Sequence, residues 1–257
     1  MANSPFSNYA YAILTANALR SPDKVALTYC GTQSFTYDQL NRKVNKVAHA
    51  LLAAGITPGT RVASLMNETL HVAEVYLAQM KLGSIVAALN PYWPADTLQA
   101  IVEASEATAF VYDATVEGLI EAVKPNLPNV KLWIKVGGDA GDSIDLDSLA
   151  ENASEAEPPY GGYGNDLLAL FYTSGTTSLP KPVMHTHLSA LATAQIWLNV
   201  HTDDSSVMGT GAIIWGIGFP ALVGPAFYAG QKSCWSRIGA RRTSSRWCRA
   251  RRSAMSR

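Results

Sequence analysis

Acidic residues are absent from the last 25 residues of this 257-residue chain. That segment holds eight of the 20 basic residues, all of them arginine. Residues 1–232 therefore carry 12 basic and 20 acidic side chains, a net charge of −8, although the formal charge of the whole chain is zero. The composition changes at Lys232, so the two parts need separate explanations.

Cysteine is also scarce, and Cys30 alone precedes the arginine-rich segment. One cysteine cannot build a disulfide framework, and this usage fits a reducing compartment. Charged residues make up 16% of the chain against 48% hydrophobic residues, which excludes intrinsic disorder. The chain is long enough to bury at least one sizeable core.

The first residues lack the basic and hydrophobic regions of a signal peptide. No lysine or arginine precedes Arg20, and Asn3, Pro5 and Asn8 interrupt the apolar residues around them. We therefore expect a cytoplasmic protein. Residues 205–231 are uncharged and long enough for a membrane span, but their six glycines and two prolines weaken a single helix. A buried strand-and-helix segment is the preferred interpretation, and a membrane span is the alternative.

Apolar segments of strand length alternate with segments of helical periodicity. Thr36 and Gln39 form a capping box at the start of an amphipathic helix that Gly55 closes. The alternation continues through residues 61–66, 68–82, 84–89, 94–105, 109–112, 116–123, 130–136 and 167–172. It predicts an α/β fold with mainly parallel sheets flanked by helices. Residues 151–165, rich in proline and glycine, predict a linker between two lobes.

A loop of small residues follows the strand predicted at residues 167–172. Its backbone N–H groups, its hydroxyl groups and the charge of Lys181 suit a polyphosphate. The hydroxyl groups belong to Thr173, Ser174, Thr176 and Thr177. The loop lacks the Gly-Lys-Ser/Thr ending of a Walker P-loop, so a kinase or GTPase function does not follow. On hydroxyl content alone, a polar surface turn is the alternative.

The full segment YTSGTTSLPKPV resembles the TSGTTG-x-PKG signature of the adenylate-forming (AMP-binding) superfamily, which includes acyl-CoA synthetases, luciferases and peptide-synthetase adenylation domains. The segments PDKVAL, FTYDQLNRKVNKVAHALLAAGITPGTRVA, LAQMKLGSIVAALNP and VMHTH are also similar to that family, in order and at similar spacing. The resemblance covers much of residues 20–232. It implies that residues 1–232 are an incomplete N-terminal AMP-binding domain, a truncated part of the large α/β domain of that fold.

The resemblance further implies an ATP-dependent acid–thiol ligase of the acyl-CoA synthetase type. In such enzymes a carboxylate attacks the α-phosphate of Mg-ATP, giving an acyl-adenylate and pyrophosphate, and coenzyme A then displaces AMP. By resemblance, the β- and γ-phosphates are held by Thr173, Ser174, Gly175, Thr176, Thr177 and Lys181. Lys181 and Thr176 are the implied catalytic residues, and Thr176 also approaches Mg. Trp215 stands where the family places an aromatic residue near ATP, although a plain core tryptophan is the alternative.

The sequence departs from the family pattern in ways that weaken the site. Ser178 and Pro182 stand where the family usually has glycine, and proline fixes φ and removes an N–H. We therefore expect weakened ATP binding. No segment resembles the family's YGxTE, its ribose-binding Gly-Asp or its C-terminal domain with a catalytic lysine. A non-catalytic, nucleotide-binding fragment is the alternative to an impaired enzyme.

The arginine-rich tail, residues 233–257, is explained by a displaced reading frame. If one nucleotide was lost near Lys232, a gene can be written whose original frame reads VVLEPDWGAANFLKVVPREKVGHVS, with VVLE as a strand, and whose displaced frame reads the observed tail. One rival is a genuine arm that binds nucleic acid through phosphates, with Trp235 and Trp247 stacking on bases. A solvated tail without function is the other rival.

Three further features are weaker. His185 and His187 are two residues apart and could begin a metal site on a strand, but two ligands are too few. The glycines from residue 209 to 216 do not fit the GxGxxG spacing of a dinucleotide-binding fold. Cys30 has no partner that the sequence places beside it, so it receives no catalytic role. The acid substrate and the oligomeric state are not specified by the sequence.

Overall fold

The computed structural model describes residues 4–30, 33–67, 69–173, 179–197, 206–209 and 219–235, and its strands form two sheets. The larger sheet has the order β7-β6-β5-β3-β4-β8-β9 and is parallel apart from the antiparallel pair β8 and β9. Its strands are β3 (Arg61–Leu65), β4 (Ile85–Ala88), β5 (Ala109–Asp113), β6 (Leu132–Val136), β7 (Ile144–Asp145), β8 (Leu167–Tyr172) and β9 (Pro182–Thr186). The predicted α/β fold is confirmed.

The smaller sheet has the order β10-β11-β1-β2. Its strands are β1 (Val25–Tyr29), β2 (Gln33–Thr36), β10 (Ser206–Gly209) and β11 (Lys232–Trp235). β11 is parallel to both of its neighbours, β1 and β10. The first three residues after Lys232 therefore belong to a sheet, at the place where the restored frame predicted a strand. Residues 236–257 lie outside the described residues.

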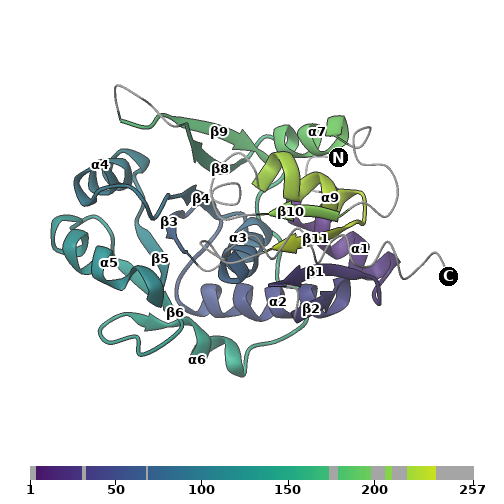
Figure 1. The fold of residues 1–257 in the computed structure, drawn as a ribbon, viewed down its shortest axis with the longest axis horizontal. Helices are drawn as coiled ribbons and strands as arrows, with labels where there is room; N and C mark the ends of the chain where they lie inside the picture. Colours follow the sequence, from purple (N-terminus) through teal and green to yellow (C-terminus); the bar gives the residue numbers. More distant parts are fainter. Residues whose placement is uncertain are drawn as a thin grey trace.

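Helices form the layers around and between these sheets. In Figure 1, α2 and α3 lie between the two sheets, while α4 and α5 lie on the opposite face of the larger sheet. The α-helices are α1 (Ala16–Arg20), α2 (Tyr37–Ala53), α3 (Thr69–Leu82), α4 (Ala95–Ser105), α5 (Glu117–Val123), α6 (Leu146–Glu151), α7 (His187–Trp197) and α9 (Gly224–Tyr228). Short 3-10 and π segments are η1 (Pro5–Ser7), η2 (Tyr11–Thr15), η3 (Ala114–Val116), η4 (Lys124–Asn126) and η5 (Phe219–Val223).

Alternating residues of the central strands divide the core between the two faces of the larger sheet. Val62 and Val111 belong to the cluster that contains α2 and α3 residues, whereas Phe110 and Tyr112 belong to the cluster with α4 and α5. Strand residues alternate in direction, so both faces must be covered, as expected for parallel strands. The central strands consequently read as continuous apolar runs in the sequence.

The predicted capping box is present at the start of α2. The Thr36 hydroxyl accepts the Gln39 N–H at 3.2 Å, and the Gln39 side chain accepts the Thr36 N–H at 3.0 Å. Two otherwise unpaired donors of the first helical turn are thereby satisfied. This device fixes the direction in which α2 leaves β2.

Residues 152–166 join α6 to β8 without a helix or strand, where the sequence predicts a linker. Glu157 anchors this segment on the fully buried ammonium group of Lys81 in α3, at 2.8 Å. Asn41 and Asn45 of α2 accept two more hydrogen bonds from Lys81, at 2.7 and 2.6 Å. Burial lowers the pKa of Lys81 to about 8, and the negative charge of Glu157 opposes that shift. The segment is therefore tied to both helices between the sheets.

Part of residues 205–231, the uncharged segment, lies within the described structure. There it forms β10, the short helices η5 and α9, and the residues that lead into β11. No helix of the described residues is long and apolar enough to cross a membrane.

Candidate functional site

The predicted phosphate loop connects β8 to β9 at one end of the larger sheet. The Thr173 N–H donates to the Lys181 carbonyl at 3.1 Å and closes the loop at its base. Thr173 and Lys181 are both exposed, so the structure brings together two of the predicted site residues with their side chains open to solvent. The other predicted loop residues, Ser174, Gly175, Thr176 and Thr177, lie outside the described residues, as does Trp215.

The loop lies at the edge of the sheet where α/β proteins bind ligands. β8 is parallel to β4, so the loop leaves β8 beside the carboxyl end of β4. Ligands of open α/β sheets bind outside the carboxyl ends of the strands. No ion pair to Lys181 is present among the described residues. The arrangement suits an anionic ligand at the loop.

Trp93 is a residue near the loop that the sequence did not single out. Its ring meets the ring of Tyr172, the last residue of β8, edge to face with centroids 5.7 Å apart. Burial raises the pKa of Tyr172 to about 12, so the phenol stays neutral at physiological pH. The signal for Trp93 was its position soon after the apolar run at residues 84–89, at the carboxyl end of β4. This aromatic pair packs against the core cluster of α4 and α5 at the end of β8, just before the loop begins.

The chain that carries this loop matches a known enzyme family. The family described as AMP-binding enzyme matches residues 14–253, which is most of the chain. The chain belongs to the AMP-binding enzyme family. The predicted resemblance to adenylate-forming enzymes is confirmed, and the match extends into the arginine-rich tail.

Curated relatives of this AMP-binding chain include acyl-CoA ligases. It is 34% identical over 165 residues to a long-chain-fatty-acid–CoA ligase, FadD13, of Mycobacterium tuberculosis, covering 63% of this chain and 31% of the relative. It is 28% identical over 226 residues to a medium-chain fatty-acid–CoA ligase of Escherichia coli K12, covering 82% of this chain and 39% of the relative. The chain thus spans about a third of the length of these curated relatives.

Solved structures share the fold. The inhibitor-bound N-terminal domain of FACL13 from Mycobacterium tuberculosis matches with a TM-score of 0.79 and 27% identity, over 90% of this chain and 57% of that one. The anthranilate CoA ligase AuaEII, in complex with anthranoyl-AMP, matches with a TM-score of 0.81 and 24% identity, over 93% of this chain and 46% of that one. The second likeness shows the fold alone.

The two histidines of the AMP-binding chain that were considered as metal ligands have separate environments. His185 lies on β9, where its ring meets that of Phe171 with centroids 5.5 Å apart. His187 begins α7, so the two residues do not share one strand as the metal hypothesis required. In the ranges that the structure describes, no three His, Cys, Asp or Glu side chains are grouped to hold a metal ion.

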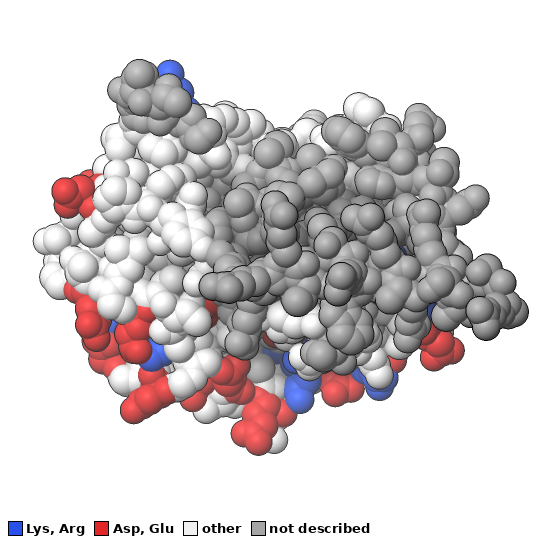
Figure 2. Space-filling view, in the orientation of Figure 1, with Lys and Arg blue, Asp and Glu red and all other residues white. Residues whose placement is uncertain are grey.

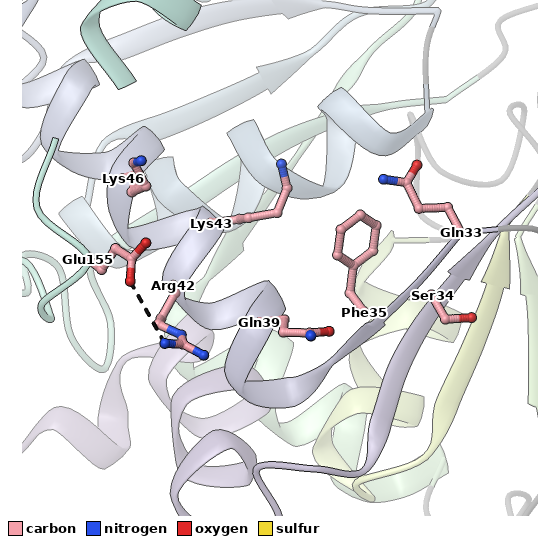
Figure 3. Close-up of a pocket in the computed structure, with 8 residues that line it drawn as sticks. All are labelled: Gln33, Ser34, Phe35, Gln39, Arg42, Lys43, Lys46 and Glu155. Atoms are coloured by element: carbon pink, nitrogen blue, oxygen red, sulfur yellow. Dashed lines mark ion pairs between the residues drawn. The ribbon is translucent and has the colours of Figure 1, made fainter. Parts of the chain in front are cut away.

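A pocket of about 390 Å³ lies between β2 and α2, away from the loop (Figure 3). It is lined by Gln33, Ser34, Phe35, Gln39, Arg42, Lys43, Lys46 and Glu155. Arg42 pairs with Glu155 at 3.9 Å, Lys43 pairs with Glu74 at 3.1 Å, and Lys46 donates to a backbone carbonyl at 2.7 Å. Each cation of the pocket already has a partner, so we assign it no ligand.

The surface charge follows the negative balance of residues 1–232. Figure 2 shows acidic side chains along the lower edge of one face, with basic ones between them. At this acidic part of the face, binding of an anionic substrate would depend on local donors such as Lys181.

Proposed function

We propose that this chain is the nucleotide-binding part of an AMP-forming acid–thiol ligase of the acyl-CoA synthetase type. Residues 1–232 then form an incomplete N-terminal AMP-binding domain with a linker near residues 151–165. The substrates are a carboxylic acid, ATP and coenzyme A, and the names of the relatives favour a fatty acid. The scarcity of cysteine favours a cytoplasmic location. The observation that carries the proposal is the closed base of the loop, which holds Thr173 and Lys181 together at the carboxyl end of β8.

The loop has the groups needed to stabilise a departing pyrophosphate. A carboxylate of the acid attacks the α-phosphate of ATP, the bond between the α-phosphate and the bridging oxygen breaks, and pyrophosphate leaves with the electron pair. Lys181, with hydroxyl and N–H donors at residues 173–177, neutralises the negative charge that develops there. Coenzyme A then attacks the acyl carbon and AMP departs.

Two parts of the proposal rest on residues outside the described ranges. Thr176 is the proposed contact of the magnesium ion that accompanies ATP, and Trp215 is the proposed aromatic neighbour of the nucleotide. The described residues offer no cluster of metal ligands in their place. We therefore derive no step through the metal.

Acid-dependent exchange of labelled pyrophosphate into ATP tests the proposed reaction directly. Fatty acids of several chain lengths are offered, and nucleotide binding is measured by calorimetry. We expect Lys181→Met to weaken ATP binding by about tenfold or more, because a charged donor is lost. Lys131→Met is the matched control, since Lys131 is an exposed lysine that donates to the Pro128 carbonyl. Equal ATP affinity of both variants and the unchanged chain would contradict the role of Lys181.

A non-catalytic, nucleotide-binding fragment is the second candidate. ATP binding without any exchange, in a chain that unfolds cooperatively, would favour this candidate over the ligase.

A further inference from the structure

The end of the β8/β9 hairpin opposite the phosphate loop is held by backbone hydrogen bonds. The His187 N–H donates to the Asp166 carbonyl at 3.1 Å, just beyond the last pair of the two strands. The Leu188 N–H donates to the Gly164 carbonyl at 2.7 Å, and the Gly164 N–H donates to the Ser7 carbonyl at 3.1 Å. The amino-terminal segment thus crosses the base of the hairpin.

The His187 ring makes a second connection to that segment. Its Nδ1 atom accepts the Tyr9 N–H at 3.0 Å, and both side chains are fully buried. An Nδ1 that accepts a hydrogen bond leaves the ring proton on Nε2. Burial lowers the pKa of His187 to about 4, so the ring stays neutral and keeps its acceptor over the physiological range.

Asn8, between Ser7 and Tyr9, extends the same contact to α3. Its carboxamide donates to the carbonyls of Met80, Gly161 and Gly162 at 3.0, 2.9 and 3.0 Å. Its Oδ1 accepts the Tyr11 N–H at 3.1 Å. A single buried side chain therefore joins the end of α3 to the segment that leads into β8.

At the contact between the end of α3 and residues 161–162, the backbones lie too close together to admit a side chain. A Cβ atom on Gly83 would lie 2.2 Å from the Gly161 carbonyl carbon, and one on Gly161 would lie 2.2 Å from the Leu82 carbonyl oxygen. A Cβ atom on Gly162 would lie 2.6 Å from Nε2 of His187. We call the whole contact the hairpin junction, and it comprises Ser7, Asn8, Tyr9, Gly83, Gly161, Gly162, Gly164 and His187.

We infer that the hairpin junction positions the phosphate loop, and that His187 and Asn8 are positioning residues for nucleotide binding. Among the described strands β9 pairs only with β8, and β8 pairs with β4 only through Ala169 and Leu170, so the junction is a second anchor that fixes the orientation of the hairpin at its base. The five residues of β9 span about 17 Å, so a tilt of about 5° at the base moves Lys181 by about 1.5 Å. A displacement of that size costs binding groups much of their effect. The inference rests on the proposed function, because it needs the loop to bind a nucleotide.

Two variants of one residue test the inference. His187→Ala removes the acceptor of the Tyr9 N–H, whereas His187→Asn keeps an acceptor oxygen near the position of Nδ1. We expect His187→Ala to weaken Mg-ATP binding by about tenfold and His187→Asn to restore it to within about threefold. His49→Ala is the control, because His49 also makes one hydrogen bond to the backbone, with the Ala156 carbonyl at 3.1 Å, but lies on α2. If His187→Ala does not fold, His187→Leu fills the buried space and replaces it.

Hydrogen–deuterium exchange separates a positioning role from a structural one without any ligand. We expect His187→Ala to raise exchange in β8 and β9 and leave exchange in β3 and β5 unchanged. Unchanged exchange in the hairpin, a general rise across both sheets, or equal ATP affinity of all variants would overturn the inference. If the unchanged chain binds no ATP, the proposed function fails, and exchange in the hairpin alone then decides whether the junction positions it.

Discussion

Glu157 is the only carboxylate paired with the buried ammonium group of Lys81 among the described ion pairs. Glu157→Gln leaves that charge with the two asparagine acceptors alone, and an uncompensated buried charge is strongly destabilising. Because the Glu157 side chain is 36% exposed, we expect a loss of about 1–3 kcal/mol in the free energy of unfolding, below the range for fully buried pairs. Urea unfolding at neutral pH measures it.

Glu155→Gln is the control for that prediction. Glu155 lies two residues away, is exposed, and contacts Arg42 at 3.9 Å, so its removal costs about 0–1 kcal/mol. Similar losses for both variants would show that the burial of Lys81 adds nothing to the pair.

His187 makes the stability of the chain sensitive to acid. Its pKa is about 4 in the folded chain and about 6.5 in the unfolded chain, so the unfolded chain binds more protons between these values. The stabilisation is therefore present above about pH 6.5 and is lost as the pH falls toward 4, by up to about 1.4 kcal/mol per unit. The nearby Asp166 carboxylate raises the pKa and reduces the effect.

The difference between the unchanged chain and His187→Asn isolates this titration, because other acidic groups are common to both. Urea unfolding across this pH range should show the difference shrinking toward low pH. A constant difference would mean that His187 has the same pKa in the folded and the unfolded chain.

The contacts of single residues were predictable from the sequence where both partners lie close together in the chain. Thr36 and Gln39 cap α2 as predicted, because the motif depends on residues three apart. The burial of Lys81 was not predictable, because Glu157 lies 76 positions away. For the same reason the contacts of Asn8 with Gly161 and of His187 with Tyr9 were not predictable, because each joins residues more than 150 positions apart.

At the scale of elements, β11 places the hydroxyl group of Ser233 in a buried, apolar position. Ser233 is fully buried between β1 and β10, and its hydroxyl has no hydrogen-bond partner among the described residues. A buried, unpaired hydroxyl costs about 1–3 kcal/mol. We expect Ser233→Val to raise the free energy of unfolding by about 1 kcal/mol and the melting temperature by about 2–4 °C, measured by calorimetry.

Thr28→Val is the matched control in the neighbouring strand, because the Thr28 hydroxyl is bonded to Ser34 at 2.9 Å and partly exposed. Thr28→Val should not raise the free energy of unfolding or the melting temperature. Destabilisation by Ser233→Val would show that the hydroxyl contributes to the fold. The restored frame places valine at this position, and the displaced-frame interpretation of residues 233–257 remains a prediction.

The parallel strands and their helices were predictable because each buries a continuous apolar run. The strand predicted at residues 61–66 is observed at Arg61–Leu65, and the one at residues 167–172 is observed with those bounds. β9 is not predicted as a strand, because its short segment carries no alternation of apolar and polar residues, and β10 lies in the predicted strand-and-helix segment without bounds of its own. The topology of the smaller sheet depends on a pairing between distant segments, which periodicity does not encode.

At the scale of the molecule, the edge strand β9 and the adjoining helix α7 expose apolar side chains. Met184 is 72% exposed, Ile196 is 70% exposed, and Leu188 and Val183 are also exposed. β9 lacks the charged residues that protect edge strands from pairing with other chains. We expect Met184→Lys to lower concentration-dependent light scattering, because it places a charge on the open edge.

Leu149→Lys is the control, since Leu149 is an exposed apolar residue of α6 that lies away from a sheet edge. It should leave scattering nearly unchanged. If both lysines lower scattering equally, the effect reflects net charge rather than the edge of the sheet.

The position of β11 also has a consequence for synthesis. β1 pairs with β2 nearby in the chain, but Leu27 also lies beside Ser233, 206 residues later. At about 5–20 residues per second, a ribosome needs about 10–40 s to make the intervening chain. Throughout that time the edge of β1 that β11 later covers stays open, and an isolated two-stranded hairpin is only marginally stable in water. The first strand to be made is therefore among the last to be completed by its neighbours, and a chaperone that shields strand edges would act on it early in translation.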